Sequence, residues 1–205
     1  MTNIIQPQFR TGPRCYLRPL DPRTDTERCY LWMNDPEVTR WLLRHTHIPY
    51  PAEASWVADV AKERPTTHHV FALVLREHDT HIGTVGVHDI DWLDRTGTSG
   101  WVIGAKEHWR NGYGFEAVML LLRYAFTGLN LRKINSSAFA PNVGSNRIHE
   151  KCGYHEAGRR RLQFFRDGSY HDEVIWELFA EDHARVWEAH RPQFEQPHID
   201  CAREP

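Results

Sequence analysis

The sequence predicts an α+β fold, in which a mixed, mostly antiparallel central sheet of about seven strands carries helices on both faces. Two observations lead to this prediction. Helical periodicity in the first third of the chain gives way near residue 69 to three strand-like segments separated by short turns, which is typical of an antiparallel meander. A strand–helix–strand unit follows at residues 98–140, and such a unit adds a parallel strand through a crossover helix.

The N-terminal third contains one predicted strand and three predicted helices. Residues 1–13 form an extension that ends at a Gly-Pro pair, and residues 14–20 are predicted as a short strand closed by prolines. Acidic residues in a first turn and prolines at helix starts mark the helices that follow. These helices are predicted at residues 24–35, 36–43 and 50–65.

The remaining elements alternate between strands and helices. The meander strands are predicted at residues 69–77, 82–93 and 98–104. A long apolar helix begins near Gly112 and is followed by a strand at 133–140 and a short helix at 142–153. A hairpin turns at Asp167-Gly168, and a last helix begins near Glu181. We therefore expect one domain over residues 14–190 and a flexible C-terminal tail over 191–205.

Composition limits the partners and the compartment. The 205 residues are 40% hydrophobic and carry a formal net charge of -2 with neutral histidines, so neither nucleic acid nor a membrane surface is an expected partner. The N-terminus shows no secretion signal, and no apolar run approaches the ~20 residues of a membrane span. Four cysteines without a C-x-x-C pair predict reduced thiols in the cytoplasm. They are Cys15, Cys29, Cys152 and Cys201.

Two glycines precede the long apolar helix. Gly112 and Gly114 lie where the first N–H groups of a helix have no internal partner, and the helix dipole attracts an anion there. Glycine allows backbone to approach an oxyanion closely, although the pair alone fits a plain turn equally well. It is not a dinucleotide fingerprint or a P-loop, since no early βαβ unit with a ribose-binding acid and no Gly-Lys-Ser/Thr accompany it.

An ordered set of motifs gives this glycine pair a context. The segments "IGAKEHWRNGYGFEAVMLLLRYAF", "SNRIHEKCGY" and "FRDGSYHDEVIWELF" together resemble the GNAT superfamily of acyl-CoA-dependent N-acyltransferases. With the early segment "YLWMNDPEVTRWL", the chain is most similar to the RimJ/RimL-like branch, over about Tyr16 to Phe179. The resemblance implies acetyl-CoA as co-substrate and a GNAT fold in which the fourth and fifth strands, at 98–104 and 133–140, splay apart.

The resemblance also implies where acetyl-CoA binds. The pyrophosphate would lie on the helix N-terminus, and the pantetheine arm would fill the gap between the splayed strands. The implied cofactor-binding residues are Trp101, Val102, Ile103, Arg110, Asn111, Gly112, Tyr113, Gly114, Phe115 and Asn142. Asn142 as a helix N-cap only is an open alternative. Trp109 and Arg110 depart from the family, which commonly has Gln or Arg and then Gly there; Arg110 adds a charge near the phosphates.

Transfer to an amine requires a base, because the ammonium form must first lose a proton. Related enzymes often carry a glutamate on the third meander strand, where this chain has Thr98. The candidates elsewhere are His88, Asp91, His171 and Asp172. We favour His88, because an unperturbed histidine titrates near pH 6.5. The strand period of two predicts that His88 shares a face with Ile90 and Trp92, and a purely structural histidine is the alternative.

The leaving thiolate benefits from a proton donor. Many GNAT proteins have a tyrosine where this chain has His149, and ribosomal-type relatives use a serine three residues after the asparagine, which matches Ser145. Ser145 and His149 are four residues apart and share a helix face. We favour Ser145 and place His149 second; Ser145 as a first-turn residue without a catalytic role is an open alternative. Backbone N–H groups around Val102 and Ile103 are the expected oxyanion donors.

In this family the acceptor pocket lies under the early helices and the final hairpin. The implied substrate-binding residues are Asn34, Trp41, Asp91 and His171. The tryptophans are expected in the core first, with some also forming a wall of this pocket; they include Trp32, Trp41, Trp56 and Trp92. A polyamine would need several carboxylates, which Asp35, Glu37, Asp89 and Asp91 could supply. No Cys/His spacing of a metal site is present, so no metal is expected.

The sequence therefore predicts an N-acetyltransferase that moves the acetyl group of acetyl-CoA directly to a primary amine, either a protein N-terminus or a small molecule. Polyamines, amino sugars and antibiotic or natural-product amines fit the same fold and stay open. A non-catalytic acyl-CoA-binding module is a further alternative, because Thr98 replaces the usual glutamate and His149 the usual tyrosine. Relatives are often dimers, so a homodimer is possible.

Overall fold

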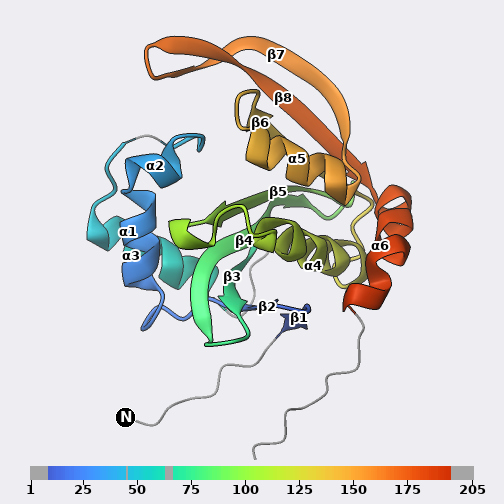
Figure 1. Cartoon of the computed structure of the whole chain (residues 1–205), viewed down its shortest axis with the longest axis horizontal. Helices are drawn as coiled ribbons and strands as arrows, with labels where there is room; N and C mark the ends of the chain where they lie inside the picture. Colours follow the sequence, from blue (N-terminus) through green and yellow to red (C-terminus); the bar gives the residue numbers. More distant parts are fainter. Residues whose placement is uncertain (1–8, 45, 63–66, 195–205) are drawn as a thin grey trace, which may run out of the picture.

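The computed structural model describes residues 9–44, 46–62 and 67–194. Within them the chain forms one eight-stranded sheet in the order β1-β2-β3-β4-β5-β6-β8-β7 (Figure 1). Only β5 and β6 are parallel; every other neighbouring pair is antiparallel. The strands are β1 (Arg10–Thr11), β2 (Cys15–Pro19), β3 (His69–Leu75), β4 (Thr80–Asp91), β5 (Thr96–Ile103), β6 (Lys133–Phe139), β7 (His155–Arg166) and β8 (Ser169–Phe179). The predicted mixed, mostly antiparallel sheet is confirmed.

The helices form two groups. The first three lie together on one side of the sheet. α4 lies on the other side, next to α5 and α6 (Figure 1). The helices are α1 (Thr26–Met33), α2 (Pro36–Thr39), α3 (Tyr50–Val60), α4 (Tyr113–Thr127), α5 (Val143–Cys152) and α6 (Ala180–Phe194), with a 3₁₀ turn at Lys106–His108. None of these helices combines the length and the apolar character that crossing a bilayer demands.

The first strands of the sheet are buried on both faces, which explains their nearly continuous apolar sequence. Leu17 of β2 and Leu73 of β3 pack in the cluster under α4. The adjacent residues Tyr16 and Ala72 point to the other face, where they pack with Val57 of α3. The sheet therefore separates two apolar layers, and its two faces can build two different parts of a site.

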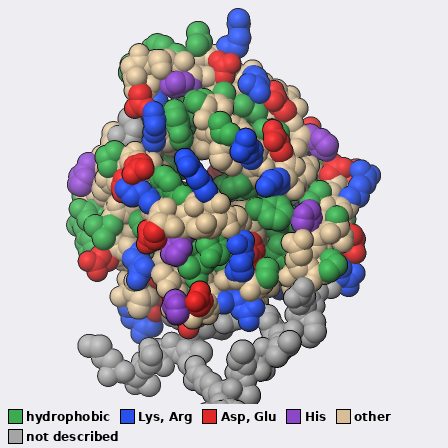
Figure 2. All heavy atoms as spheres, viewed as in Figure 1, with side chains coloured by type: hydrophobic (Ala, Val, Ile, Leu, Met, Phe, Trp, Pro, Cys, Tyr) green, Lys and Arg blue, Asp and Glu red, His purple; other side chains and the backbone are tan. Residues whose placement is uncertain are grey.

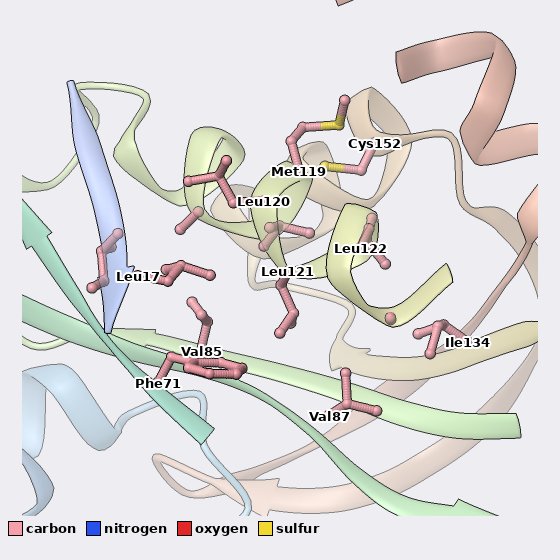
Figure 3. Close-up of a cluster of buried hydrophobic side chains, with 14 of the residues drawn as sticks. Leu17, Phe71, Val85, Val87, Met119, Leu120, Leu121, Leu122, Ile134 and Cys152 are labelled. Atoms are coloured by element: carbon pink, nitrogen blue, oxygen red, sulfur yellow. The ribbon is translucent and has the colours of Figure 1, made fainter. Parts of the chain in front are cut away.

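Helix α4 holds the larger layer together. Its residues Met119, Leu120, Leu121 and Leu122 are at most 2% exposed; in Figure 3 Leu121 points toward the sheet, whereas Met119 lies beside Cys152 of α5. Burying each such side chain contributes roughly 1.5–3 kcal/mol. This packing fixes the direction of α4, and with it the position of the helix N-terminus.

A β-bulge in β4 changes which side chains share a face. The register with β5 shifts between His88 and Asp91, and Asp89 adopts a left-handed backbone with φ 50°. As a result Ile90 joins Val87 in the layer under α4, whereas His88 faces the α1–α3 side. The prediction that His88 and Ile90 share a face is wrong, because a bulge inserts one residue and reverses the alternation beyond it.

The ordered domain extends past both predicted boundaries. Strand β1 lies inside the predicted extension at 1–13 and pairs with β2, and the Phe9 ring stacks on Phe71 with centroids 5.0 Å apart. Helix α6 continues to Phe194, whose ring lies 5.1 Å from that of Trp187. In both places an aromatic side chain packs on the domain and orders the backbone around it.

The surface carries both signs of charge. On the face shown in Figure 2, Lys and Arg side chains lie among Asp and Glu side chains, with hydrophobic side chains between them. This mixture accords with the formal net charge of -2. No large area of a single sign covers this face, so the charge pattern gives no sign of a polyanionic partner there.

The stability of the fold should depend on two buried histidines. His149 and His183 are 1% and 2% exposed, and burial lowers the pKa of each to about 4. The unfolded chain takes up these protons below about pH 6.5, while the folded chain does so only near pH 4. We expect the free energy of unfolding to fall by about 1.4 kcal/mol per pH unit for each histidine between pH 6.5 and 4, in denaturant titrations.

The variant His183→Phe should remove part of this slope, because phenylalanine does not titrate. The site suits an apolar ring: both ring nitrogens of His183 lack a hydrogen-bond partner among the described residues, and the ring centroids of His183 and Phe126 are 5.3 Å apart. The matched control is His155→Gln, a substitution of an exposed histidine. An unfolding free energy that stays constant from pH 6.5 to 4 in the unsubstituted chain would contradict this account.

Candidate active site

The two parallel strands at the centre of the sheet separate after three pairs. β5 and β6 pair only at Thr96↔Lys133, Gly97↔Ile134 and Thr98↔Asn135. Beyond this point β6 continues on β8 and β5 continues on β4, so the backbone of Trp101–Ile103 has no strand partner on its β6 side among the described residues. The predicted splay of the fourth and fifth strands of the family is confirmed. It leaves exposed amide groups along one edge of β5.

A buried group of polar side chains closes the point where the strands separate, and we call it the fork cluster: Ser99, Ser136, His149 and Tyr154. Ser136 Oγ donates to the Ser99 carbonyl at 3.1 Å, and Ser99 Oγ lies 2.7 Å from the Tyr154 hydroxyl. His149 Nε2 lies 2.8 Å from Ser136 Oγ. The cluster satisfies polar groups that the separating strands would otherwise leave unpaired.

This position argues against His149 as the proton donor. Its Nδ1 lies 2.9 Å from the Ser145 carbonyl, so both ring nitrogens are engaged within the protein. The ring stacks on Trp176 with centroids 5.2 Å apart, and burial lowers the pKa of His149 to about 4. A neutral, stacked imidazole with a protein oxygen at hydrogen-bond distance from each ring nitrogen stabilises the fork rather than supplying a proton near neutral pH.

The N-terminus of α4 forms an open cradle of backbone N–H groups. Gly112 is the N-cap with φ 84°, a left-handed conformation that favours glycine, and no side chain caps the helix. The first-turn N–H groups of Tyr113, Gly114 and Phe115 therefore keep their capacity for an anion. Gly114 has a different reason to be glycine, because a Cβ there would lie 2.8 Å from Ile148 Cδ1 on α5.

Arg14, which the sequence argument missed, places a guanidinium group beside this cradle. Its Nε binds Glu116 Oε2 at 3.0 Å and its Nη1 donates to the Asn111 carbonyl at 2.8 Å. Its Nη2 would lie 3.2 Å from a Cβ on Gly112. The sequence held one signal: Glu116, an acid in the buried face of an apolar helix, needs a cationic partner. This cationic partner, Arg14, lies about a hundred residues earlier in the chain, so the sequence pattern alone did not identify it.

The unusual lead-in to the cradle has a structural reason. Trp109 Nε1 donates to the Ile103 carbonyl at 2.7 Å, which ties the loop to the end of β5. Arg110 is exposed and adopts φ 63°, so it occupies a left-handed position where the family commonly has glycine. The loop therefore keeps a backbone conformation that glycine favours. For Arg110, which has a Cβ, this conformation lowers the free energy of unfolding by about 1–2 kcal/mol.

Helix α5 brings Ser145 to the same region. Asn142 is its N-cap, and Asn142 Oδ1 accepts a hydrogen bond from Ser145 N at 3.2 Å. One turn later on the same face, the His149 ring lies 4.6 Å from Trp101 on β5. Ser145 is half-buried, and its Oγ makes no hydrogen bond to the part of the chain that the structure describes. Its hydroxyl is thus available at the β5 side of α5.

On the opposite face of the sheet, His88 reaches over two glycines. It lies directly across from Thr98, the position where relatives often carry a glutamate. The neighbouring pair Gly86↔Gly100 has no side chain to obstruct it, and a Cβ on Gly86 would lie 3.1 Å from His88 Nε2. Burial lowers the pKa of His88 from its ordinary value. The imidazole is therefore neutral at pH 7 and can accept a proton.

A cavity of about 390 Å³ opens on this face between α1, α3 and the sheet. Val102 of β5 and Thr84 of β4 form its floor, and Trp32 and Trp56 line it, as expected for some of the tryptophans. Trp56 also lines a second hollow of about 320 Å³ that contains His88. The cavity therefore adjoins both the unpaired edge of β5 and the candidate base.

The four residues predicted to bind the acceptor lie outside this cavity. The Asn34 side chain donates to the carbonyls of Tyr30 and Ile48 at 2.9 and 3.1 Å and accepts from Ile48 N at 2.9 Å. Asp91 Oδ1 accepts from two backbone N–H groups of the turn after β4, both at 2.9 Å. Each side chain is thus engaged in holding a loop.

The other two acceptor candidates lie together elsewhere. The rings of Trp41 and His171 are 5.6 Å apart, in an edge-to-face arrangement next to Phe139. The hairpin tip is fixed over this region, because Arg166 donates to the Leu42 carbonyl at 2.7 Å. Proximity of Trp41 and His171 follows from the packing of the β7–β8 hairpin on the segment after α2, which no local sequence pattern encodes. Among the described residues, no three His, Cys, Asp or Glu side chains converge to hold a metal.

Comparisons with known proteins agree with this geometry. The family model described as an acetyltransferase (GNAT) domain matches residues 14–155. The chain is 26% identical over 174 residues to the N-acetyltransferase p20 of Bacillus licheniformis, covering 83% of this chain and 96% of p20. It is 32% identical over 97 residues to the N-acetyltransferase YoaA of Bacillus subtilis, covering 47% of this chain and 54% of YoaA. The chain thus spans nearly all of p20 but about half of YoaA.

The fold is also that of solved acetyltransferases. The structure of spermidine N-acetyltransferase from Vibrio cholerae with CoA and spermine superposes with a TM-score of 0.76, at 22% identity, covering 83% of this chain and 98% of that one. The chain belongs to the GNAT acetyltransferase family. Fold and family are those of the acetyl-CoA-dependent GNAT acetyltransferases.

Two substitutions test the backbone of the cradle. Arg110→Gly relieves a left-handed residue and should raise the free energy of unfolding by about 1 kcal/mol. Gly112→Ala imposes the same strain and places a Cβ against Arg14, so it should lower that free energy by about 1 kcal/mol and weaken CoA binding. Denaturant titration and calorimetry with CoA measure these effects. Changes of the same sign in both unfolding free energies would refute this description of the loop.

Proposed function

We propose that the chain is an N-acetyltransferase that moves the acetyl group of acetyl-CoA directly to a primary amine. The position of Val102 carries this proposal. Its neighbours Trp101 and Ile103 turn their backbone amides toward the unpaired edge of β5 beyond the fork, whereas the Val102 side chain lines the cavity on the α1–α3 side. A thioester held along this edge would meet an amine held in the cavity, which is the geometry that direct transfer requires.

The cradle supports the cofactor part of the proposal. The uncapped N–H groups of α4, the left-handed Gly112 and the Arg14 guanidinium suit a pyrophosphate group. Trp101–Ile103 offers backbone amides to the amide groups of a pantetheine arm, and the Asn142 side chain lies at the other side of the gap. Acetyl-CoA would supply the activated acyl group, and these residues would bind and orient it.

His88 is the proposed base. It lies in the hollow that shares Trp56 with the cavity, and the glycines at 86 and 100 place no side chain beside its ring. It would accept the proton that the acceptor ammonium releases. Its position across from Thr98 lets it serve the region where relatives carry a glutamate, which weakens the main reason for a non-catalytic module.

Ser145 is the proposed acid, and the backbone N–H of Ile103 is the proposed oxyanion donor, because it faces the open edge of β5 whereas the Val102 N–H faces β4. Across the reaction the amine nitrogen gains a C–N bond and the thioester loses its C–S bond. The ammonium nitrogen gives up two protons: His88 passes one to solvent, and the other restores the Ser145 hydroxyl after it has protonated the leaving sulfur. The products are an amide and a free thiol.

The activity itself is measured with purified protein, acetyl-CoA and a panel of primary amines, with release of thiol as the readout. We expect thiol release that depends on the amine, and a CoA complex detectable by calorimetry. Absence of CoA binding would rule out the whole proposal. CoA binding without turnover of any amine would instead favour an acyl-CoA-binding module.

His88→Gln tests the base. We expect kcat/KM to fall by about 10²-fold or more, with CoA binding unchanged. In the unsubstituted enzyme kcat/KM should decline as the pH drops through the pKa of His88, which burial holds below 6.5, because only the neutral ring accepts a proton. The control is His171→Gln, the other histidine candidate, which lies outside the cavity. An acid limb that persists in His88→Gln would assign the base to another group.

A further inference from the structure

The walls of the 390 Å³ cavity point to the kind of amine it accepts. α3 contributes Glu53, which is 4% exposed although it carries a carboxyl group. Its Oε1 is buried without a hydrogen-bond partner among the described residues. A buried carboxyl oxygen that lacks a partner is costly to the free protein. Since Glu53 lines the cavity, a donor group on a bound molecule can complete its hydrogen bonding.

Charge around Glu53 is sparse. Burial raises the pKa of Glu53, and the positive charge of Arg44 counteracts this effect. Arg44 is exposed and lines the same cavity, but among the described residues it does not provide the hydrogen-bond partner that Glu53 Oε1 lacks. The cavity therefore offers one carboxylate to one cationic nitrogen, and Arg44 opposes the entry of further positive charge.

The rest of the cavity is aromatic and apolar. Trp32 is fixed in place, because its indole lies flat against Gly104, where a Cβ would overlap the ring, and its ring meets that of His81 at 4.9 Å. Trp56, Ile48 and Met33 also contribute to the apolar walls. Indole faces bind both apolar bodies and ammonium groups, the latter through cation–π attraction.

The carboxylates that a polyamine would need are engaged elsewhere. Lys106 Nζ binds Asp35 Oδ2 and Glu37 Oε2, each at 2.8 Å. Asp91 holds the turn after β4. Asp89 alone lies near the substrate side, in the second hollow beyond Trp56. The four acids considered for a polyamine therefore do not form a row along the cavity.

We propose that the acceptor is a compact monoamine, whose ammonium group enters beside Glu53 and whose apolar body lies between Trp32 and Trp56. This inference rests on the proposed function. Glu53 recognises the charged form, and His88 in the adjoining hollow takes up the proton before transfer. The solved relative with CoA and spermine shares the fold, whereas this chain selects a different amine through the chemistry of its own cavity.

The first test compares 2-phenylethylamine, n-butylamine and spermidine as acceptors under identical acetyl-CoA. We expect kcat/KM for 2-phenylethylamine to exceed that for spermidine by about tenfold or more, with n-butylamine in between. Arg44→Ala should reduce this preference by improving spermidine. Equal or better use of spermidine would overturn the monoamine inference while leaving the N-acetyltransferase proposal intact. CoA binding without acetylation of any amine would instead overturn the proposed function.

The second test is Glu53→Gln. We expect KM for 2-phenylethylamine to rise about tenfold or more with kcat nearly unchanged, because a charge-assisted contact to the bound amine is lost. CoA affinity and the thermal midpoint should not fall, since the variant removes a buried charge. The matched control is Glu27→Gln, an exposed glutamate of α1. An unchanged KM, or a loss confined to kcat with an altered pH profile, would overturn the recognition role of Glu53.

Discussion

The separation of β5 from β6 is the constraint on which the rest of the site depends. A sheet normally pairs every backbone group of its central strands, so three pairs followed by a gap need a compensating interaction. The fork cluster supplies it, with Ser136 bound to the Ser99 carbonyl and His149 bound to Ser136. Because these groups are buried within hydrogen-bond distance of one another, the strands can diverge while the polar atoms at the apex keep protein partners.

Everything that touches the proposed cofactor is positioned from this fork. The free edge of β5 ends at Ile103, and Trp109 ties the loop that follows to that carbonyl. The loop then turns at Gly112 into α4, whose direction is fixed by its buried apolar face. Arg14 joins from the first strands through its pair with Glu116. A strand edge, a helix N-terminus and a cation thus meet although they come from distant parts of the sequence.

The two faces of the sheet have different roles in the proposed site. The face under α4 is a closed apolar layer that keeps the cradle rigid. The other face carries the cavity, the His88 ring and the Glu53 carboxyl, and it tolerates polar groups because α1 and α3 cover it incompletely. Val102 connects the two, since it belongs to β5 beyond the fork and its side chain lines the cavity. This division is a physical reason why members of one fold family can differ in acceptor while keeping one cofactor site.

The sequence by itself determined the order of strands and helices from residue 14 onward, the cradle glycines and the family, because periodicity, turn residues and ordered motifs are local properties. It also singled out His88 and Ser145, whose roles stay predictions. Only the tertiary structure decided that a bulge at Asp89 turns His88 away from Ile90, that His149 serves the fork, that Asn34 holds a loop, and that Arg14 and Glu53 line the two halves of the site. Those outcomes depend on contacts between residues far apart in the chain, which no local pattern records.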